Sequence, residues 1–211
     1  MRRLRILVTA GPTREYFDTI RFISNPSSGK MGYAIATAAA RRGHRVTLVS
    51  GPVELPAPRG VRVVRVVSAA EMLAAARAAF RTAEVLVYAA AVCDWRPARR
   101  ARQKRAKAGG ALSVRLVATP DIAATLGRVK GRRIAVGFAL EDHSGRAHAR
   151  QKMARKNFDL VLLNGPRNIG ADVAEYELLD RAGRWQRWRA SKRAIAARLI
   201  RRIESLAGTD A

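Results

Sequence analysis

The sequence predicts an α/β fold of the Rossmann-like, doubly wound type, with a mostly parallel sheet and helices on both faces. Short apolar, β-branched runs alternate with longer alanine-rich segments, as expected for parallel strands joined by right-handed helical crossovers. The chain has 211 residues, 48% of them hydrophobic, which is enough for one well-buried domain over 1–211. We find no internal repeat and no linker that would divide it.

The first half of the chain begins with a strand at Arg5–Ala10, an apolar run of the kind buried in parallel sheets. A long loop rich in turn-forming residues follows through Ser28. A helix then starts near Gly29, and Gly43 is expected at its C-cap. The remaining elements are strands at Arg45–Gly51, Gly60–Val67 and Glu84–Val92, and a helix that begins with the capping box of Ser68 and Glu71.

The second half is less regular. A basic, glycine-bearing segment at 102–113 is expected to be mobile, and a helix begins after it near Thr119 or Asp121. The other expected elements are strands at Arg132–Glu141 and Leu160–Gly165, a helix at 147–159 between them, a hairpin turning at Ala182–Gly183, and a terminal amphipathic helix with Ile195, Leu199 and Ile203 on one face.

A doubly wound sheet binds its ligands beyond the carboxyl ends of its strands. This rule predicts that three segments meet at one edge: the loop after Ala10, the turn after Ser50 and the residues after Val92. Asp94 follows the last of these strands. A carboxylate there would bind ribose hydroxyls or a metal ion, or would simply cap a turn.

The loop "NPSSGKMG", Asn25–Gly32, has the composition of a phosphate-binding loop but not the Walker pattern. The backbone N–H groups and dipole of the helix that follows favour an anion. Gly29 and Gly32 let a ligand approach the backbone, while Ser27 and Ser28 would either cap the helix or contact phosphate. An ordinary capped helix is the alternative. No G-x-G-x-x-G fingerprint is present, so a nicotinamide cofactor is disfavoured.

Lysine is scarce in this chain. The sequence holds 41 lysine and arginine residues, and seven of them are lysines. A compact ammonium on a flexible stem suits phosphate contacts. Five of the lysines fall in segments predicted to ring the ligand edge of the sheet: Lys30, Lys104, Lys107, Lys152 and Lys156. The last two are spaced i, i+4, so both project from one helical face.

The net charge of +25 raises a second hypothesis, a Rossmann-like nucleic-acid-binding protein. The arginines are scattered over every segment, as compositional drift would also produce, so we disfavour this class. A gel-shift experiment discriminates between the two. No apolar run approaches the length of a membrane span. Cys93 is the only cysteine, which fits a reducing cytoplasm, and the histidines lack the spacing of a zinc site.

The motifs, in their order, resemble phosphopantothenoylcysteine synthetase, the ligase half of the bacterial bifunctional coenzyme A biosynthesis protein. The residues that carry the resemblance reach to about Asn164: "ILVTAGPTRE", "RFISNPSSGKMG", "VTLVSGPV", "AAAVCDWRP", "TPDI", "VGFALE" and "ARQKMARKN". The resemblance implies a stand-alone synthetase domain without the flavin-dependent decarboxylase domain, which would be a separate partner. It also implies a homodimer formed through the second half of the chain.

The reaction that the resemblance implies joins 4′-phosphopantothenate and L-cysteine at the expense of CTP. The substrate carboxylate attacks the α-phosphate of CTP, giving an acyl-cytidylate and pyrophosphate, and the cysteine amine then displaces CMP. Such a reaction needs no nucleophile from the protein. It depends on positioning and on charge stabilisation, with Mg²⁺ offsetting the charge of the triphosphate.

Matched position by position, the resemblance implies that Asn25 handles the acyl intermediate and that Lys104 binds nucleotide and promotes turnover of that intermediate. Asp121 is implied as a Mg²⁺ or phosphate–water contact. Three departures from the family pattern concern the substrate side: Ala106 in "KRAK", Gly165 after Asn164, and the lack of an asparagine in "GADVAEYELL". The implied nucleotide-binding positions are Tyr88, Ala89, Ala90, Asp94, Lys104, Pro120, Asp121, Ile122, Ala123, Phe138, Lys152 and Lys156.

Overall fold

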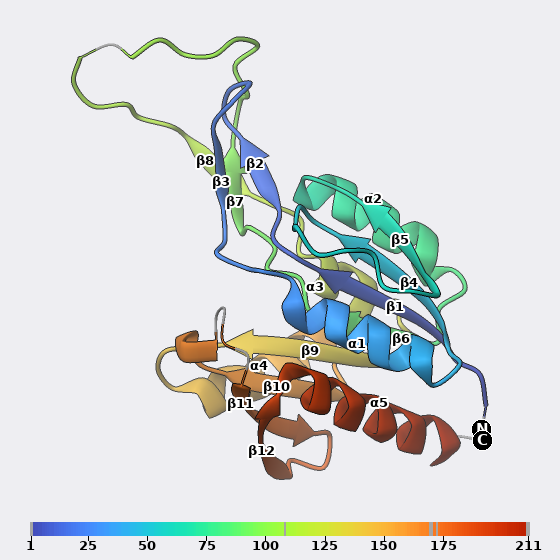
Figure 1. The fold of residues 1–211 in the computed structure, drawn as a ribbon. Coiled ribbons are helices and arrows are strands. Elements are labelled where there is room, and N and C mark those ends of the chain that lie inside the picture. The colour runs from blue at the N-terminus through green and yellow to red at the C-terminus, as the bar shows by residue number, and fades with distance from the viewer. Residues whose placement is uncertain (1, 108, 169–170, 172, 210–211) are drawn as a thin grey trace.

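An eight-stranded sheet forms the centre of the molecule in the computed structural model, which describes residues 2–107, 109–168, 171 and 173–209. The strand order is β12-β11-β10-β9-β6-β1-β4-β5, and the sheet runs through the whole body of the molecule (Figure 1). The strands are β1 (Arg5–Ala10), β4 (Arg45–Ser50), β5 (Val61–Arg65), β6 (Val85–Tyr88), β9 (Ile134–Leu140), β10 (Leu160–Asn164), β11 (Val173–Asp180) and β12 (Trp185–Ser191).

Parallel pairing extends from β5 to β10, and β11 and β12 add an antiparallel hairpin at one edge. The chain starts at β1, moves outward to β4 and β5, and then returns to place β6 on the other side of β1. The strand order therefore reverses between β1 and β6. In doubly wound sheets such a switch point leaves a crevice at the carboxyl ends of the strands.

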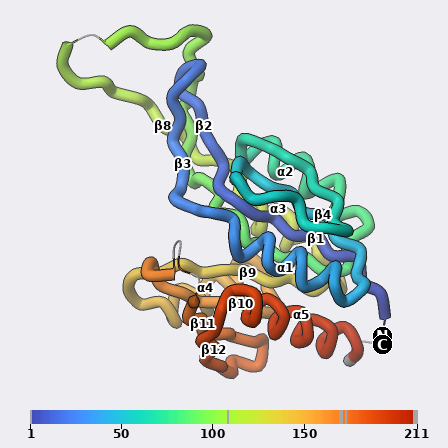
Figure 2. Tube along the Cα trace, in the orientation of Figure 1, coloured from blue at the N-terminus to red at the C-terminus, as the bar shows by residue number. Residues whose placement is uncertain are grey.

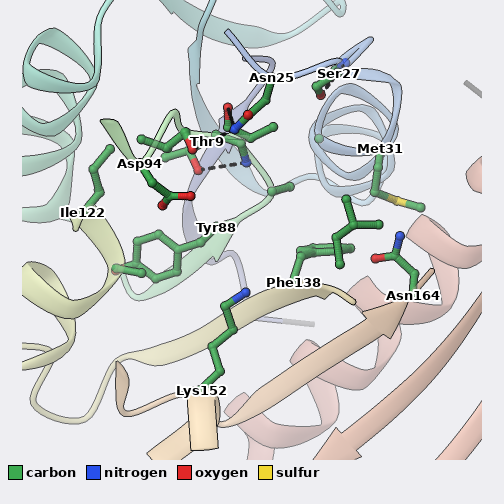
Figure 3. Close-up of a pocket in the computed structure, with 18 of the residues that line it drawn as sticks. Thr9, Asn25, Ser27, Met31, Tyr88, Asp94, Ile122, Phe138, Lys152 and Asn164 are labelled. Carbon is green, nitrogen blue, oxygen red and sulfur yellow. Dashed lines mark hydrogen bonds between the residues drawn. The ribbon is translucent and has the colours of Figure 1, made fainter. Parts of the chain in front are cut away.

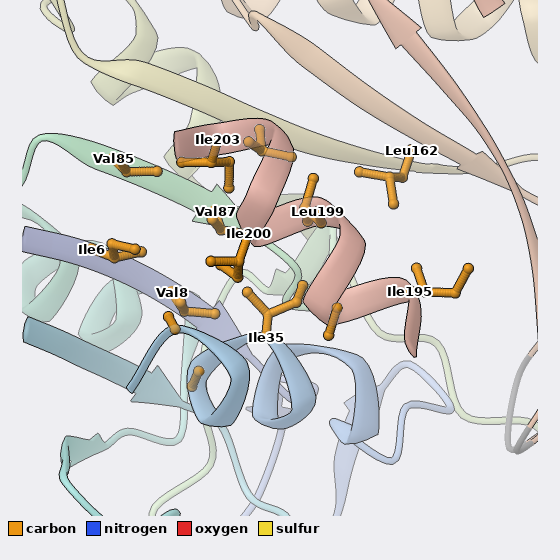
Figure 4. Close-up of a cluster of buried hydrophobic side chains, with 14 of the residues drawn as sticks. Ile6, Val8, Ile35, Val85, Val87, Leu162, Ile195, Leu199, Ile200 and Ile203 are labelled. Atoms are coloured by element: carbon orange, nitrogen blue, oxygen red, sulfur yellow. The ribbon is translucent and has the colours of Figure 1, made fainter. Parts of the chain in front are cut away.

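Helices cover both faces of the sheet. Successive side chains of a strand point to opposite faces, so each buried strand contributes to an apolar cluster on either side. Ile6 and Val8 of β1 belong to one apolar cluster, with α1 and α5 (Figure 4), and Leu7 belongs to the other, with α2, α3 and α4. The predicted doubly wound fold is confirmed. The helices are α1 (Lys30–Arg41), α2 (Ala69–Phe80), α3 (Ile122–Gly127), α4 (Gly145–Lys156) and α5 (Lys192–Thr209), with a 3₁₀ turn at Pro166–Asn168.

A projecting arm, comprising residues 14–24, 95–107 and 109–118, rises from the sheet. It contains two short antiparallel pairs, β2 (Arg14–Tyr16) with β3 (Phe22–Ser24) and β7 (Trp95–Pro97) with β8 (Leu116–Ala118). The segment between β7 and β8 extends furthest from the body in both views (Figures 1 and 2). The loop expected after the first strand therefore contains a hairpin that its turn-forming residues did not reveal.

Several expected boundaries are corrected by a few residues. The strand expected over Glu84–Val92 ends at Tyr88, since the chain leaves the sheet there to line a cavity. Arg42 is the C-cap of α1 and Gly43, with φ 84°, follows it. The expected capping box is present, since the Ser68 side chain accepts from the Glu71 N–H. The expected C-terminal hairpin is also present, as β11 and β12. Ile195, Leu199 and Ile203 of α5 are buried as expected.

The other boundary differences lie at element ends. The strands expected at Gly60–Val67, Arg132–Glu141 and Leu160–Gly165 are shorter by one to three residues, as the bounds of β5, β9 and β10 show. The helix expected at 147–159 is α4, which starts earlier and ends at Lys156 because Asn157 adopts φ 54°. Within the described residues no helix has the length and apolar character needed to cross a membrane.

Candidate active site

A cavity of about 490 Å³ lies at the carboxyl ends of β1, β6, β9 and β10, at the point where the strand order reverses (Figure 3). Its walls come from the start of α1, the residues after β6, the start of α3 and one side of α4. Of the described residues that line it, Lys30, Lys152, Lys156 and Lys192 are basic, and Asp94 and Asp121 are acidic. The cavity is thus suited to an anionic ligand.

The N-terminus of α1 opens into this cavity. Gly29 is the N-cap with φ 70° and makes no side-chain cap itself. Of the two serines expected there, Ser27 accepts from the Gly29 N–H through Oγ at 3.4 Å, and both serines line the cavity. A Cβ on Gly32 would lie 2.5 Å from the Cβ of Ala10, so the helix start approaches β1 at a distance that only glycine permits. Such a close-packed helix N-terminus favours an anion.

Asn25 joins two loops at the rim of the cavity. Its Nδ2 donates to the carbonyl oxygen of Val92 at 3.0 Å and to that of Ala91 at 3.5 Å. The side chain therefore fixes the loop after β3 against the loop after β6, and both loops line the cavity (Figure 3). These two hydrogen bonds fix the orientation of the Asn25 amide.

Tyr88 lies deep in the cavity wall and packs against Phe158, with ring centroids 5.6 Å apart. Burial, with the negative charge of Asp121, raises the pKa of Tyr88. Within the described residues the buried Tyr88 hydroxyl has no hydrogen-bond partner. Ala89 and Ala90 follow it, and their N–H groups donate to Thr9, at 3.1 Å to its carbonyl oxygen and at 3.4 Å to Oγ1.

Lys152 and Lys156 reach the cavity from α4. Burial lowers the pKa of Lys152, and the neighbouring Lys156 lowers it further, while Glu141, whose Oε1 lies 4.0 Å from the Lys152 ammonium, opposes the shift. Lys156 instead pairs with Asp121 at 3.0 Å. The two ammonium groups predicted to share a face thus meet in one cavity, at a cost to the charged form of Lys152.

Asp121 is already engaged at two points. It is the N-cap of α3, where Oδ1 accepts from the Ala124 N–H at 3.0 Å, and Oδ2 faces Lys156. The Ala124 N–H and Lys156 lower the pKa of Asp121 against the opposing effect of burial. The neighbouring Pro120, Ile122 and Ala123 line the cavity, as does Asp94. Among the described residues no cluster of three or more His, Cys, Asp or Glu side chains is placed to hold a metal.

Other cavity residues were missed from the sequence. Leu140 and Asn164 end β9 and β10, so the edge rule applied to those strands would have found them. Tyr176, which meets the expected residue Phe138 edge-on at 6.0 Å, and Lys192 come from the terminal hairpin and α5. No local signal points to them, since only the pairing of β11 with β10 brings them to the cavity. The remaining unexpected lining residues include Thr9, Pro26, Met31, Ala91, Val92, Thr119, Phe158 and Asn168.

Two expectations differ from the described cavity. Lys104 does not line it, and neither does Lys107, because both lie in the segment of the arm between β7 and β8. The three segments expected at one edge do meet there, since the Gly51 N–H donates to the Ala10 carbonyl oxygen and the Cys93 N–H donates to Thr13 Oγ1, both at 2.9 Å. The turn after Ser50 nevertheless lines a second cavity of about 730 Å³, and the described residues that it shares with the first are 25–28. The strand β4 lies on the far side of β1 from β6, so its carboxyl end opens away from the switch point.

A family model described as DNA/pantothenate metabolism flavoprotein C-terminal domain matches residues 1–206. The chain is 49% identical over 168 residues to the coenzyme A biosynthesis bifunctional protein CoaBC of Escherichia coli K12, covering 78% of this chain and 41% of that protein. It is 40% identical over 204 residues to CoaBC of Haemophilus influenzae, covering 95% and 51%. The chain therefore spans about half of these relatives, or less.

Solved structures agree with this match. The C-terminal domain of CoaBC superimposes with a TM-score of 0.86 at 34% identity, covering 98% of this chain and 96% of that one. A DNA/pantothenate metabolism flavoprotein from Streptococcus pneumoniae, 21% identical, shares the fold with a TM-score of 0.85, covering 96% and 99%. The chain belongs to the DNA/pantothenate metabolism flavoprotein C-terminal domain family, in which its fold matches the C-terminal domain of CoaBC.

Proposed function

We propose that the protein is a phosphopantothenate–cysteine ligase of coenzyme A biosynthesis that uses CTP. The carboxylate of 4′-phosphopantothenate forms a bond to the α-phosphorus of CTP, and the bond from that phosphorus to the bridging oxygen of pyrophosphate breaks. The amine of L-cysteine then attacks the acyl carbon, CMP leaves, and the amine loses its proton. The product is phosphopantothenoylcysteine.

The observation that carries this proposal is the cavity at the strand switch point, which is lined by the start of α1, with Gly29 as its N-cap, and by Lys152 and Lys156. A nucleoside triphosphate suits this lining, because its phosphates favour backbone N–H groups at a helix start and ammonium groups. Membership of the DNA/pantothenate metabolism flavoprotein C-terminal domain family, with relatives named as coenzyme A biosynthesis proteins, supports this choice of reaction.

Different cavity and arm residues would serve different steps of this reaction. Lys152 and Lys156 offset the charge that repels an incoming carboxylate, and the backbone around Ala89 and Ala90 reads the base. Asn25, whose Nδ2 is held by Val92, stands beside the acyl–phosphate linkage without competing with the cysteine amine. Lys104 promotes turnover of the acyl-cytidylate from the arm.

Mg²⁺ would enter with the triphosphate and offset its charge. The donor set suits an ion held mostly by phosphate oxygens and water, as is usual for Mg²⁺, because the Asp121 carboxylate is tied to the start of α3 and to Lys156. We propose that Asp121 meets the ion or its water only as one contact among these.

Pyrophosphate release, measured in a coupled assay, tests the function. Sustained release over many turnovers is expected only when CTP, 4′-phosphopantothenate and L-cysteine are all present with Mg²⁺, because without cysteine the acyl-cytidylate stays on the enzyme after one turnover. The same assay with ATP, UTP and GTP tests nucleotide choice, and turnover with ATP alone would exclude the CTP form. No pyrophosphate with any of the four nucleotides would overturn the ligase proposal.

We further propose a homodimer, whose product a phosphopantothenoylcysteine decarboxylase activity would consume. Exposed apolar side chains gather on the arm: Ile20, Phe22, Trp95, Leu112 and Leu116. A second copy of the chain would cover them, so the proposed interface extends beyond the second half of the chain that was expected. A cytoplasmic location stays a prediction.

A further inference from the structure

A buried carboxylate, that of Asp18, connects the two parts of the arm: the hairpin of β2 and β3, and the segment between β7 and β8. Asp18 lies in the turn between β2 and β3, and its side chain is fully buried. Buried carboxylates require hydrogen bonds to every oxygen, since an unpaired buried charge is costly. Asp18 meets this requirement with donors from two distant parts of the chain.

The two oxygens of Asp18 have different partners. Oδ1 accepts from the N–H groups of Ile20 and Arg21, at 2.7 and 2.6 Å, and so closes the turn. Oδ2 accepts from Nη1 of Arg21 at 3.0 Å and from the N–H of Arg105 at 3.3 Å. One oxygen therefore shapes the hairpin, and the other holds a residue that lies 87 positions further along the chain.

Further hydrogen bonds align the same two segments. Nη1 of Arg21 also donates to the carbonyl oxygen of Arg105 at 3.1 Å, so both backbone groups of that residue are held by the Asp18–Arg21 pair. Nε of Arg100 donates to the carbonyl oxygen of Asp18, and the N–H of Ala101 donates to that of Phe17. Residues 100–105 thus run along the hairpin and are attached at both ends.

We propose that Asp18 is a positioning residue that holds Lys104 through the backbone of Arg105. The role rests on the function proposed for Lys104 in turnover of the acyl-cytidylate. Lys104 is adjacent to the fixed residue, so its Cα has little freedom while Oδ2 of Asp18 holds the Arg105 N–H. Lys104 does not line the cavity of its own chain, so in the proposed homodimer it would act on the intermediate bound by the second copy. Without the attachment to Asp18 the ammonium group samples many positions, and each productive encounter with the intermediate becomes rarer.

Asp18 stays ionised, as a permanent hydrogen-bond acceptor for the arm must. The N–H of Arg21, with those of Ile20 and Arg105 and the Arg21 charge, lowers the pKa of Asp18 from 3.8 to about 2, against the opposing effect of burial. The carboxylate therefore keeps its charge, and its acceptors, throughout the range in which an enzyme would work.

The substitution Asp18→Asn separates the two roles of this side chain, which are to close the turn through Oδ1 and to hold the Arg105 N–H through Oδ2. The amide oxygen can still accept from the N–H groups of Ile20 and Arg21, which keeps the turn. The amide nitrogen replaces Oδ2 and presents a donor to the two donors from Arg21 and Arg105, which breaks the link to the segment. The variant is thus aimed at the attachment and not at the hairpin.

Asp180→Asn is a matched control. Asp180 closes the hairpin between β11 and β12, where Oδ1 accepts from the Arg184 N–H at 3.1 Å and Oδ2 accepts from Arg184 Nε at 3.0 Å. Its side chain is also buried, but its partners are Arg184 and Arg202 of the far edge. Both variants replace a buried carboxylate in a hairpin turn by an amide, but only Asp18→Asn releases the segment that bears Lys104.

Steady-state kinetics of the full chain test the proposal. For Asp18→Asn we expect kcat to fall about tenfold, with the KM for CTP changed less than twofold, and Asp180→Asn to keep the wild-type kcat. In a Lys104→Ala background, Asp18→Asn is expected to give no further loss of kcat, since both act on one step. Hydrogen–deuterium exchange over 100–105 is expected to rise only in Asp18→Asn.

An equal kcat in wild type and Asp18→Asn, or losses that multiply in the double variant, would overturn the positioning role while leaving the ligase proposal intact. Unchanged exchange over 100–105 in Asp18→Asn would also overturn it. A wild-type protein that makes no product would overturn the ligase proposal itself, and with it the role of Lys104.

Discussion

Lys152 carries a charge that its surroundings disfavour. Burial and the nearby Lys156 lower its pKa from 10.5, although Glu141 and Asp94 oppose them. A bound phosphate would favour the ammonium form and raise this pKa again. Binding of CTP at this side chain should therefore be coupled to uptake of a proton.

The affinity for CTP is accordingly expected to fall as the pH rises through the lowered pKa of Lys152 toward 10.5, because the bound state then holds a proton that the free protein has lost. Lys152→Met should weaken binding about tenfold or more and flatten this pH dependence. Isothermal titration calorimetry in buffers of different ionisation enthalpy measures both effects. An unchanged dissociation constant in the variant would remove Lys152 from the nucleotide site.

Asn25 is expected to act after CTP has bound. Asn25→Asp should retain CTP binding but stall after acyl-cytidylate formation, since a carboxylate cannot donate a hydrogen bond to the acyl oxygen, which gains negative charge as the cysteine amine attacks. The carboxylate would also face the carbonyl oxygens of Ala91 and Val92, which now accept from Nδ2, so a small loss of stability should accompany it. Rapid-quench mass spectrometry detects the stalled intermediate. Loss of CTP binding would contradict this role.

At the scale of single residues, the sequence placed most of the cavity correctly. Asn25 and Lys152 line it because they lie in a loop beyond a strand and on a helix whose positions follow from the fold. Tyr88, the last residue of β6, also lines it and was expected only from the family resemblance. Lys192 was missed, since its place depends on how the C-terminal hairpin pairs with β10, which no local pattern encodes. Lys104 was expected at the cavity edge, but the arm carries it elsewhere.

At the scale of elements, the start of α1 depends on its contact with β1. Gly32 allows this contact because any side chain there would meet Ala10, whose Cβ lies 2.5 Å from the Cβ that alanine would add. The N-terminal end of α1 is part of the cavity wall. A displacement of this helix would therefore affect both packing and ligand binding.

Gly32→Ala is expected to lower the free energy of unfolding by about 1–3 kcal/mol, as overpacking of a close contact does, and to weaken CTP binding. Gly208→Ala is the matched control, because this glycine also lies in a helix and a Cβ there meets nothing within 4 Å. Chemical denaturation and CTP titration measure the two effects. A Gly32→Ala protein as stable as wild type would show that the close contact is not required.

The arm was the element that the sequence concealed. Its strands β2, β3, β7 and β8 have three residues each, too few for a periodic pattern to stand out from the surrounding turn-forming residues. The buried strands β1, β6 and β10 were recognised because continuous apolar runs are typical of parallel strands covered on both faces.

At the scale of the whole molecule, the reversal of strand order between β1 and β6 creates the cavity. The alternation of strands and helices predicted the fold, but the strand order itself could not be derived from local patterns. It decides that the ends of β6, β9 and β10 share one cavity with α1, whereas the end of β4 opens into another. We propose that the activated acid forms at this switch point.

Isotope transfer from 4′-phosphopantothenate labelled with ¹⁸O in its carboxylate tests the acyl-cytidylate most directly. If the carboxylate attacks the α-phosphate of CTP, one labelled oxygen leaves with CMP when the cysteine amine displaces it, and mass spectrometry of the CMP detects the shift. Formation of CDP, with ¹⁸O found in inorganic phosphate and none in CMP, would show activation at the γ-phosphate and would contradict the proposed chemistry.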